Sequence, residues 1–148
     1  MRIVIGSDHA GWLLKNSVVA FVQAQGHEVT DVGSFNDEPV DFPDIAKALT
    51  GEIKSGAADR GIMVCGTGVG ASIAANKVRG IRAAVCHDVH SAHQCVEHDD
   101  VNVMCIGAQI VGPWLANDLV AAYLDAEFST DEDCRRRVEK LHEMDQSQ

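Results

Sequence analysis

The sequence predicts a three-layer α/β/α, Rossmann-like domain in which helices cover both faces of a five-stranded parallel sheet. Short apolar runs alternate with amphipathic helical stretches along the 148 residues, as they do in chains of right-handed strand–helix–strand units. The run Ile62–Val64 is apolar without interruption, which is typical of a strand buried on both faces. The chain is 46% hydrophobic and has no linker or repeat, so we expect one domain spanning residues 1–148.

Each expected element follows from a local signal. Apolar runs predict strands at residues 2–6, 27–32, 62–65, 81–86 and 102–106. Apolar residues repeated every three or four positions predict helices at residues 12–25, 43–53, 71–79, 87–97, 113–123 and 129–144. Gly26 is expected to end the first helix, and Pro43 and Pro113 suit the first turns of two later ones. Residues 129–148 are expected to form a charged C-terminal helix and a polar tail.

Charge and composition argue against several kinds of partner. The formal net charge of −10 disfavours nucleic acid and anionic membranes, since both require clustered positive charge. No apolar run approaches the ~20 residues that span a bilayer, and Met1 leads directly into the first expected strand without a signal peptide. The five cysteines are odd in number and lack CxxC spacing, which favours reduced thiols and a cytoplasmic protein.

The segment from Cys65 to Gly70 predicts an active site. Cys65 ends a buried strand, where open α/β sheets place their ligands. Gly66, Gly68 and Gly70 allow a tight turn with exposed N–H groups before a helix, and a helix N-terminus favours negative charge. A cysteine in that setting can form a reactive thiolate, although a cysteine that ends a buried strand more often serves packing.

The same turn also matches a dinucleotide-binding fingerprint. Residues 66–71 read G-x-G-x-x-A, and Asp88 lies 20 residues beyond Gly68, as the acid that binds a ribose does. Against this interpretation, the motif follows the third strand rather than the first, and the chain lacks the second half that holds the other nucleotide. A non-catalytic nucleotide-binding module is the alternative from a different functional class.

Polar residues follow two further strands of the expected sheet. Asp8 and His9 come after the first strand and residues 86–88 after the fourth, so we expect all of them at the same sheet edge as Cys65. Asp8 could equally be an ordinary helix N-cap, and His9 a polar loop residue.

The remaining candidates lie towards the C-terminus. The histidines of residues 87–98 could present metal ligands on one helix face, or belong to a solvated helix. His98 is expected to leave that helix just before Asp99, where it could exchange protons near neutral pH. Arg135–Arg137 form a basic cluster that could hold a phosphate or carboxylate, or offset the acidic residues before it.

Six segments, taken in chain order, carry a family resemblance. They are Gly6-Ser-Asp8-His9-Ala-Gly11, Asp41-Phe-Pro-Asp44, Cys65-Gly-Thr-Gly-Val-Gly70, Ser72-Ile-Ala-Ala-Asn-Lys77, Gly80-Ile-Arg-Ala83 and Asn102-Val103. Together they resemble type B ribose-5-phosphate isomerase, a family that includes the subunits of galactose-6-phosphate isomerase. The likeness runs from residue 2 to about residue 141.

The resemblance implies aldose–ketose isomerisation through a cis-enediolate, without a metal or cofactor. It implies that Cys65 is the base that moves a proton between C1 and C2, and that Thr67 and His98 open the sugar ring. The residues expected to bind the sugar or sugar phosphate are Asp8, His9, Gly66, Gly68, Gly70, Asp99 and Arg137. Family members are homodimers or homotetramers, in which each site draws residues from two subunits.

Four residues depart from the family pattern. Asp99 stands where asparagine is common and Phe42 where tyrosine is common. Gln109 and Asp133 each replace an arginine that the family associates with the substrate's phosphate. The resemblance implies ribose 5-phosphate and ribulose 5-phosphate as substrates first, with a tetrose phosphate, an unphosphorylated sugar or a sugar acid as alternatives.

Overall fold

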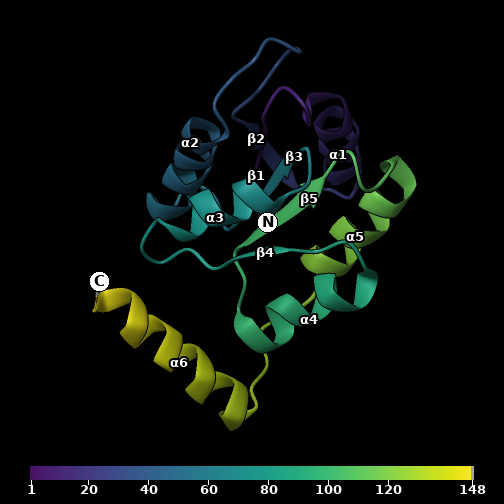
Figure 1. Ribbon diagram of the computed structural model, residues 1–148. Coiled ribbons are helices and arrows are strands. Elements are labelled where there is room, and N and C mark those ends of the chain that lie inside the picture. The colour runs from purple at the N-terminus through teal and green to yellow at the C-terminus, as the bar shows by residue number, and fades with distance from the viewer. Residues whose placement is uncertain (148) are drawn as a thin grey trace.

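The computed structural model describes residues 1–147 and places one parallel sheet between two layers of helices (Figure 1). The strands lie in the order β2-β1-β3-β5-β4, which confirms the predicted fold class. Their bounds are β1 (Arg2–Ser7), β2 (Glu28–Asp31), β3 (Arg60–Cys65), β4 (Ala83–Val85) and β5 (Val103–Gly107). The helices are α1 (Trp12–Ala24), α2 (Phe42–Lys54), α3 (Val69–Asn76), α4 (Val89–Asp99), α5 (Pro113–Asp125) and α6 (Glu132–Gln146).

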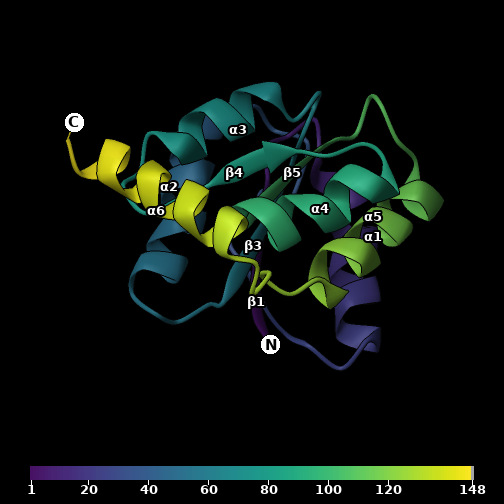
Figure 2. The same cartoon turned by 90° about the horizontal axis from the view of Figure 1, so that it is seen from below.

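Both faces of the sheet are buried. Ile3 and Ile5 of β1 face the core covered by α1, α4 and α5, whereas Val4 between them faces the core covered by α2 and α3. Figures 1 and 2 show these two groups of helices on opposite sides of the strands. Burial of alternate residues on both faces explains why the strand sequences are continuously apolar. Among residues 1–147, no helix is long and apolar enough to cross a lipid bilayer.

The boundaries of α3, α4 and α6 differ from the predicted ones, and the N-terminal boundaries follow local capping. Helix α3 begins two residues early, at Val69, after Gly68 turns the chain at φ +82°. Helix α4 begins after its N-cap Asp88 and continues to Asp99, so the expectation that residue 98 lies outside this helix is wrong. Helix α6 begins at residue 132 because the side chain of Asp131 accepts N–H groups of its first turn.

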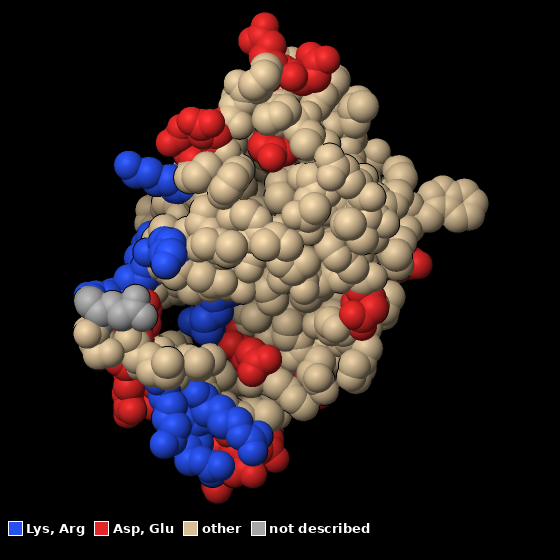
Figure 3. Space-filling model, in the orientation of Figure 1, with Lys and Arg blue, Asp and Glu red and all other residues tan. Residues whose placement is uncertain are grey.

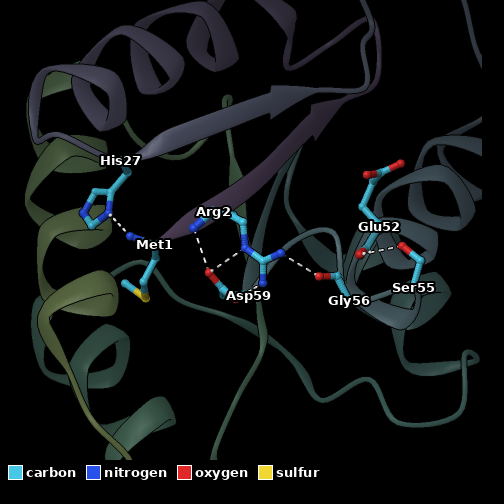
Figure 4. Close-up of polar contacts among 7 residues, drawn as sticks. All are labelled: Met1, Arg2, His27, Glu52, Ser55, Gly56 and Asp59. Carbon is cyan, nitrogen blue, oxygen red and sulfur yellow. Dashed lines mark hydrogen bonds and ion pairs between the residues drawn. The ribbon is translucent and has the colours of Figure 1, made fainter.

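The amino-terminal ends of β1 and β3 are joined by polar contacts (Figure 4). The backbone and guanidinium of Arg2 donate to the carboxylate of Asp59 at 2.8 and 2.6 Å, and Nη1 donates to the carbonyl of Gly56 at 2.8 Å. The terminal amine of Met1 lies 3.1 Å from Nδ1 of His27. Hydrogen bonds from Arg2 hold the pKa of Asp59 below its ordinary value. These contacts fix the register of the two strands that carry the candidate site at their other ends.

A buried ion pair fixes the loop that follows β2. Lys15 is fully buried, and its Nζ donates to both carboxylate oxygens of Asp31, at 2.8 and 2.7 Å. The same carboxylate accepts the N–H of Gly33 at 2.9 Å. The ammonium also lies 4.6 Å from the ring centroid of Phe35. Lys15 therefore holds the start of the β2–α2 loop against α1.

We expect Lys15→Met to destabilise the fold. The substitution keeps the volume of the side chain but leaves the Asp31 carboxylate without its cation, and breaking a buried pair costs about 3–5 kcal/mol. Because the Asp31 side chain is 26% exposed, we expect the lower end, about 3 kcal/mol of unfolding free energy. Urea denaturation measures this change, with exposed Lys47 (Lys47→Met) as the matched control. Equal midpoints for both variants would contradict the structural role.

Candidate active site

The candidate site lies at the carboxyl ends of β1 and β3. These strands are neighbours, and the chain leaves them for opposite sides of the sheet, β1 towards β2 and β3 towards β4. Open α/β sheets bind ligands at such a switch point. The segments brought together here are residues 8–11 after β1 and residues 65–70 after β3, as the sequence predicts.

The thiol of Cys65 turns back towards the glycine turn. Its Sγ accepts the backbone N–H of Gly68 at 2.9 Å, and the residue is 5% exposed. The start of α3 thus directs a backbone N–H donor at the sulfur. Gly68 has φ +82°, and a Cβ there would also lie 3.3 Å from the carbonyl carbon of Ile106. Glycine is therefore required at the residue whose N–H meets the sulfur.

The segment at the end of β5, residues 107–109, packs against the glycine turn at residues 66–70. Ala108 donates its N–H to the carbonyl of Cys65 at 2.7 Å, and Gln109 donates to the carbonyl of Gly66 at 2.9 Å. A Cβ on Gly107 would lie 2.7 Å from backbone atoms of Thr67, so the two backbones meet at a point where only glycine fits. Residues 86–88 follow β4 at the same edge of the sheet as Cys65, as predicted, but β5 lies between β3 and β4. The neighbouring segment is therefore residues 107–109.

Asp8 and His9 follow β1, the strand that pairs with the Cys65 strand β3. Asp8 is buried, and its Oδ1 accepts the N–H groups of Ala10 and Gly11, both at 3.0 Å. The carboxylate thus shapes the turn into α1, whose N-cap residue is Gly11. His9 accepts the N–H of Val40 on Nδ1 at 3.2 Å. Because a backbone N–H can only donate, the proton of a neutral His9 ring is on Nε2, which is left as a donor.

The other predicted site residues lie at the opposite edge of the sheet. Helix α4 starts after the carboxyl end of β4 and finishes before the amino end of β5, so His98 and Asp99 are at the amino edge. Val103 is level with Gly61, and Gly107 is level with Cys65. At about 3.3 Å per residue, the length of β5 alone puts about 13 Å between the two edges. One chain therefore does not bring His98 to Cys65.

Arg137 also lies away from Cys65, on α6. This helix packs against α4 and stands apart from the sheet (Figure 1). Basic side chains gather over it, and the surface is hollowed between it and the rest of the molecule (Figure 3). Asp99 lines this recess of about 400 Å³ together with Arg82 and His142. In the basic cluster, Arg136 pairs with Asp133 at 2.5 Å and Arg135 lies over the ring of Phe128.

The other cysteines have different surroundings from Cys65. All five are free and buried. Burial raises the pKa of the Cys105 thiol in β5, and a hydrogen bond with Cys86 together with burial raises that of Cys95. Hydrocarbon and other thiols thus disfavour the thiolates of Cys95 and Cys105. Cys65 differs from them because its sulfur accepts a backbone N–H.

The alternative interpretations find less support in the geometry. Asp88, the acid of the dinucleotide fingerprint, accepts the N–H and hydroxyl of Ser91 at 2.7 and 2.6 Å, so its place is explained by capping. On the histidine-rich helix, His93 pairs with Glu97 at 3.3 Å. In the part of the chain that the structure describes, no three His, Cys, Asp or Glu side chains are grouped so that they could hold a metal ion.

Sequence reasoning missed Val40 and Gly107, and it did not predict the contact between His87 and Gly107. His87 accepts the N–H of Gly107 on Nε2 at 2.8 Å, beside the segment that supports the glycine turn. A glycine that ends a buried strand was a usable signal for Gly107. Nothing local in the sequence shows that Val40 meets His9, because these residues are 31 positions apart.

A cysteine that can move a proton beside a carbonyl, with backbone donors for the oxygen, suits the class of aldose–ketose isomerases. Comparison with known families agrees. Residues 3–141 match the family described as Ribose/Galactose Isomerase. The chain belongs to this family and is a ribose-5-phosphate isomerase B-like sugar-phosphate isomerase, which confirms the resemblance found in its motifs.

Individual relatives cover nearly the whole chain. The ribose-5-P isomerase B of Listeria innocua is 41% identical over 146 residues, which are 99% of this chain and 98% of that protein. The D-erythrulose-4-phosphate isomerase of Pectobacterium atrosepticum is 44% identical over 130 residues, 86% of this chain and 85% of that one. The Clostridium thermocellum ribose-5-phosphate isomerase B has a TM-score of 0.96 at 46% identity, with 99% of each chain covered. The Mycoplasma genitalium enzyme with bound ribulose-5-phosphate has a TM-score of 0.93 at 32% identity, covering 99% and 97%.

Proposed function

We propose that this enzyme interconverts ribose 5-phosphate and ribulose 5-phosphate with Cys65 as the base. The observation that carries the proposal is the 2.9 Å hydrogen bond from the N–H of Gly68 to Sγ of Cys65. It marks Cys65 as the thiol at the carboxyl end of β3 whose sulfur accepts a backbone donor at the start of a helix. The reduced state of all five cysteines supports a cytoplasmic location.

In the proposed reaction the Cys65 thiolate takes the proton from C2 of the open-chain aldose. The C2–H electron pair forms the C1–C2 double bond of a cis-enediolate, and the negative charge moves to O1. Backbone N–H groups of the turn at residues 66–70 would receive that charge, and one such donor is worth about 2.7–4 kcal/mol. The thiol then returns its proton to C1, while O1 and O2 exchange one proton, so no atom is gained or lost. Thr67 and His98 would open the sugar ring beforehand.

We infer that the positive charge for the phosphate comes from another chain. The segments that follow the five strands at the Cys65 edge (8–11, 32–41, 66–70, 86–88 and 108–112) contain no lysine or arginine. They contain five acidic residues instead. A dianionic substrate at this edge therefore needs cations from outside it. The exposed arginines of α6, at the far edge of the same chain, are suitable donors if a second copy supplies them.

We therefore propose a homodimer, alone or within a tetramer, in which each site is shared. One subunit would supply Asp8, His9 and the residues from Cys65 to Gly70. The other would supply His98, Asp99 and Arg137 from its amino edge. The separation of these two groups within one chain supports this arrangement, and so does the recess beside α6, which a second subunit could enter.

A tetrose phosphate is the second candidate substrate. Gln109 lies over Gly66, where an added Cβ would be 3.3 Å from its side-chain amide. A neutral amide at the turn recognises hydroxyl groups rather than phosphate charge. The similarity to D-erythrulose-4-phosphate isomerase favours the same alternative.

An isomerisation screen tests both candidates. The substrates are ribose 5-phosphate, erythrulose 4-phosphate, and the matching sugars without phosphate. We expect the phosphorylated pentose to have the highest kcat/KM, and loss of the phosphate to lower it at least about 100-fold, because one charge-assisted hydrogen bond contributes about 1.5–3 kcal/mol. A higher value for the tetrose phosphate would favour the second candidate. Equal rates for free sugars, or saturable NAD(H) binding without turnover, would contradict the proposal.

A further inference from the structure

A histidine side chain completes the hydrogen bonding of β5 where its neighbouring strand stops. β4 ends at Val85, and the last backbone bond between the two strands runs from the N–H of Cys86 to the carbonyl of Cys105. The next donor on that side of β5 is the N–H of Gly107. It meets Nε2 of His87 at 2.8 Å instead of a strand carbonyl. The imidazole therefore takes the place of the missing strand.

This contact defines the state of the His87 ring. Because the Gly107 N–H donates, Nε2 carries no proton, and the proton of the neutral ring is on Nδ1. The adjacent carboxylate of Asp88 caps α4, and its two oxygens accept the N–H and hydroxyl of Ser91. His87 is half-buried and Gly107 is buried, so loss of the ring would leave an N–H without a partner.

Gly107 is the first residue of the segment that supports the glycine turn. Its backbone touches that of Thr67, and the next two residues donate to the carbonyls of Cys65 and Gly66. A shift in the position of Gly107 would therefore also shift the glycine turn, because three contacts connect them. The conformation of the glycine turn then sets the 2.9 Å distance between the Gly68 nitrogen and Sγ of Cys65.

We propose that His87 is a positioning residue for isomerisation, acting through Gly107 on the geometry of the thiol and its backbone donors. It does not touch the substrate. The inference rests on the proposed role of Cys65 and goes beyond it. Misplacing a reacting group by about 1 Å can cost on the order of 100-fold in rate, so a side chain that holds the supporting segment is expected to affect kcat more than KM.

Three substitutions separate this role from simple packing. His87→Gln places an amide oxygen at the position of Nε2, whereas in His87→Asn the oxygen reaches only as far as Nδ1, and His87→Ala removes the acceptor. We expect Ala and Asn to lower kcat about tenfold to 100-fold with KM changed by less than about twofold, and Gln to restore most of kcat. His93→Ala, on the exposed face of α4, is the control and is expected to retain wild-type rates.

Two measurements do not depend on turnover. In wild-type protein, ¹⁵N NMR is expected to report an unprotonated Nε2 on His87. Hydrogen exchange of the Gly107 amide is expected to be faster in the Ala and Asn variants and near wild type in Gln. A protonated Nε2, or equal exchange in all variants, would overturn the inference even if the enzyme has a different substrate. Wild-type kcat in both Ala and Asn variants would also overturn it, whereas a wild type inactive on every sugar tested would count against the proposed function alone.

Discussion

Isomerase activity is expected to disappear when Cys65 is replaced by alanine, while the fold persists. The thiol is the proposed base, and loss of a general base typically costs on the order of 10²–10⁴ in rate. Alanine removes only a small buried group, at a cost of about 1 kcal/mol in unfolding free energy. The measurements are kcat on ribose 5-phosphate and a thermal melt followed by circular dichroism.

Cys105 provides the matched control for this experiment. It lies in β5 beside β3, is also buried, and pairs in register with Met63. Burial raises the pKa of its thiol, so it is a poor base at neutral pH. Cys105→Ala is expected to lose a similar amount of stability and to keep its activity. If the Cys65→Ala variant remained active, the proposed mechanism would be wrong.

The glycine turn could be predicted from the sequence because its determinants are local. An apolar strand, a cysteine and three spaced glycines lie within nine residues, from 62 to 70. Each of these signals can be interpreted from the residues next to it in the sequence. The helix boundaries were less accurate, because they depend on single capping side chains such as Asp88 and Asp131.

The neighbours of the turn could not be predicted in the same way. Strand order decides that residues 107–109, rather than 86–88, lie beside Cys65, and strand order follows from contacts far apart in the sequence. The same limit applies to His98. Its type and its place before β5 suggested a proton-transfer group, but the direction of α4 puts it at the amino edge of its own chain.

Mixed subunits are expected to restore activity that neither parent variant has. If sites are shared, Cys65→Ala and His98→Ala remove groups contributed by different subunits. In a two-fold symmetric dimer containing one subunit of each kind, one site has both defects and the other has neither. We expect each variant alone to be inactive, and the mixed dimer, isolated with two affinity tags, to have about half of the wild-type activity per dimer. The His98 side chain is exposed and makes no hydrogen bond among the described residues of its own chain, so its replacement should not disturb folding.

The reciprocal arrangement makes the test decisive. A chain carrying both substitutions, combined with a wild-type chain, puts one defect in each shared site, so this mixed dimer is expected to be inactive. If Cys65 and His98 instead acted within one chain, the results would be reversed: the first mixed dimer would be inactive, and the second would keep about half of its activity. Both mixed dimers contain one cysteine and one alanine at position 65 and one histidine and one alanine at position 98. Differences in expression or stability therefore cannot produce the reversal. Only the distribution of the groups between subunits can do so.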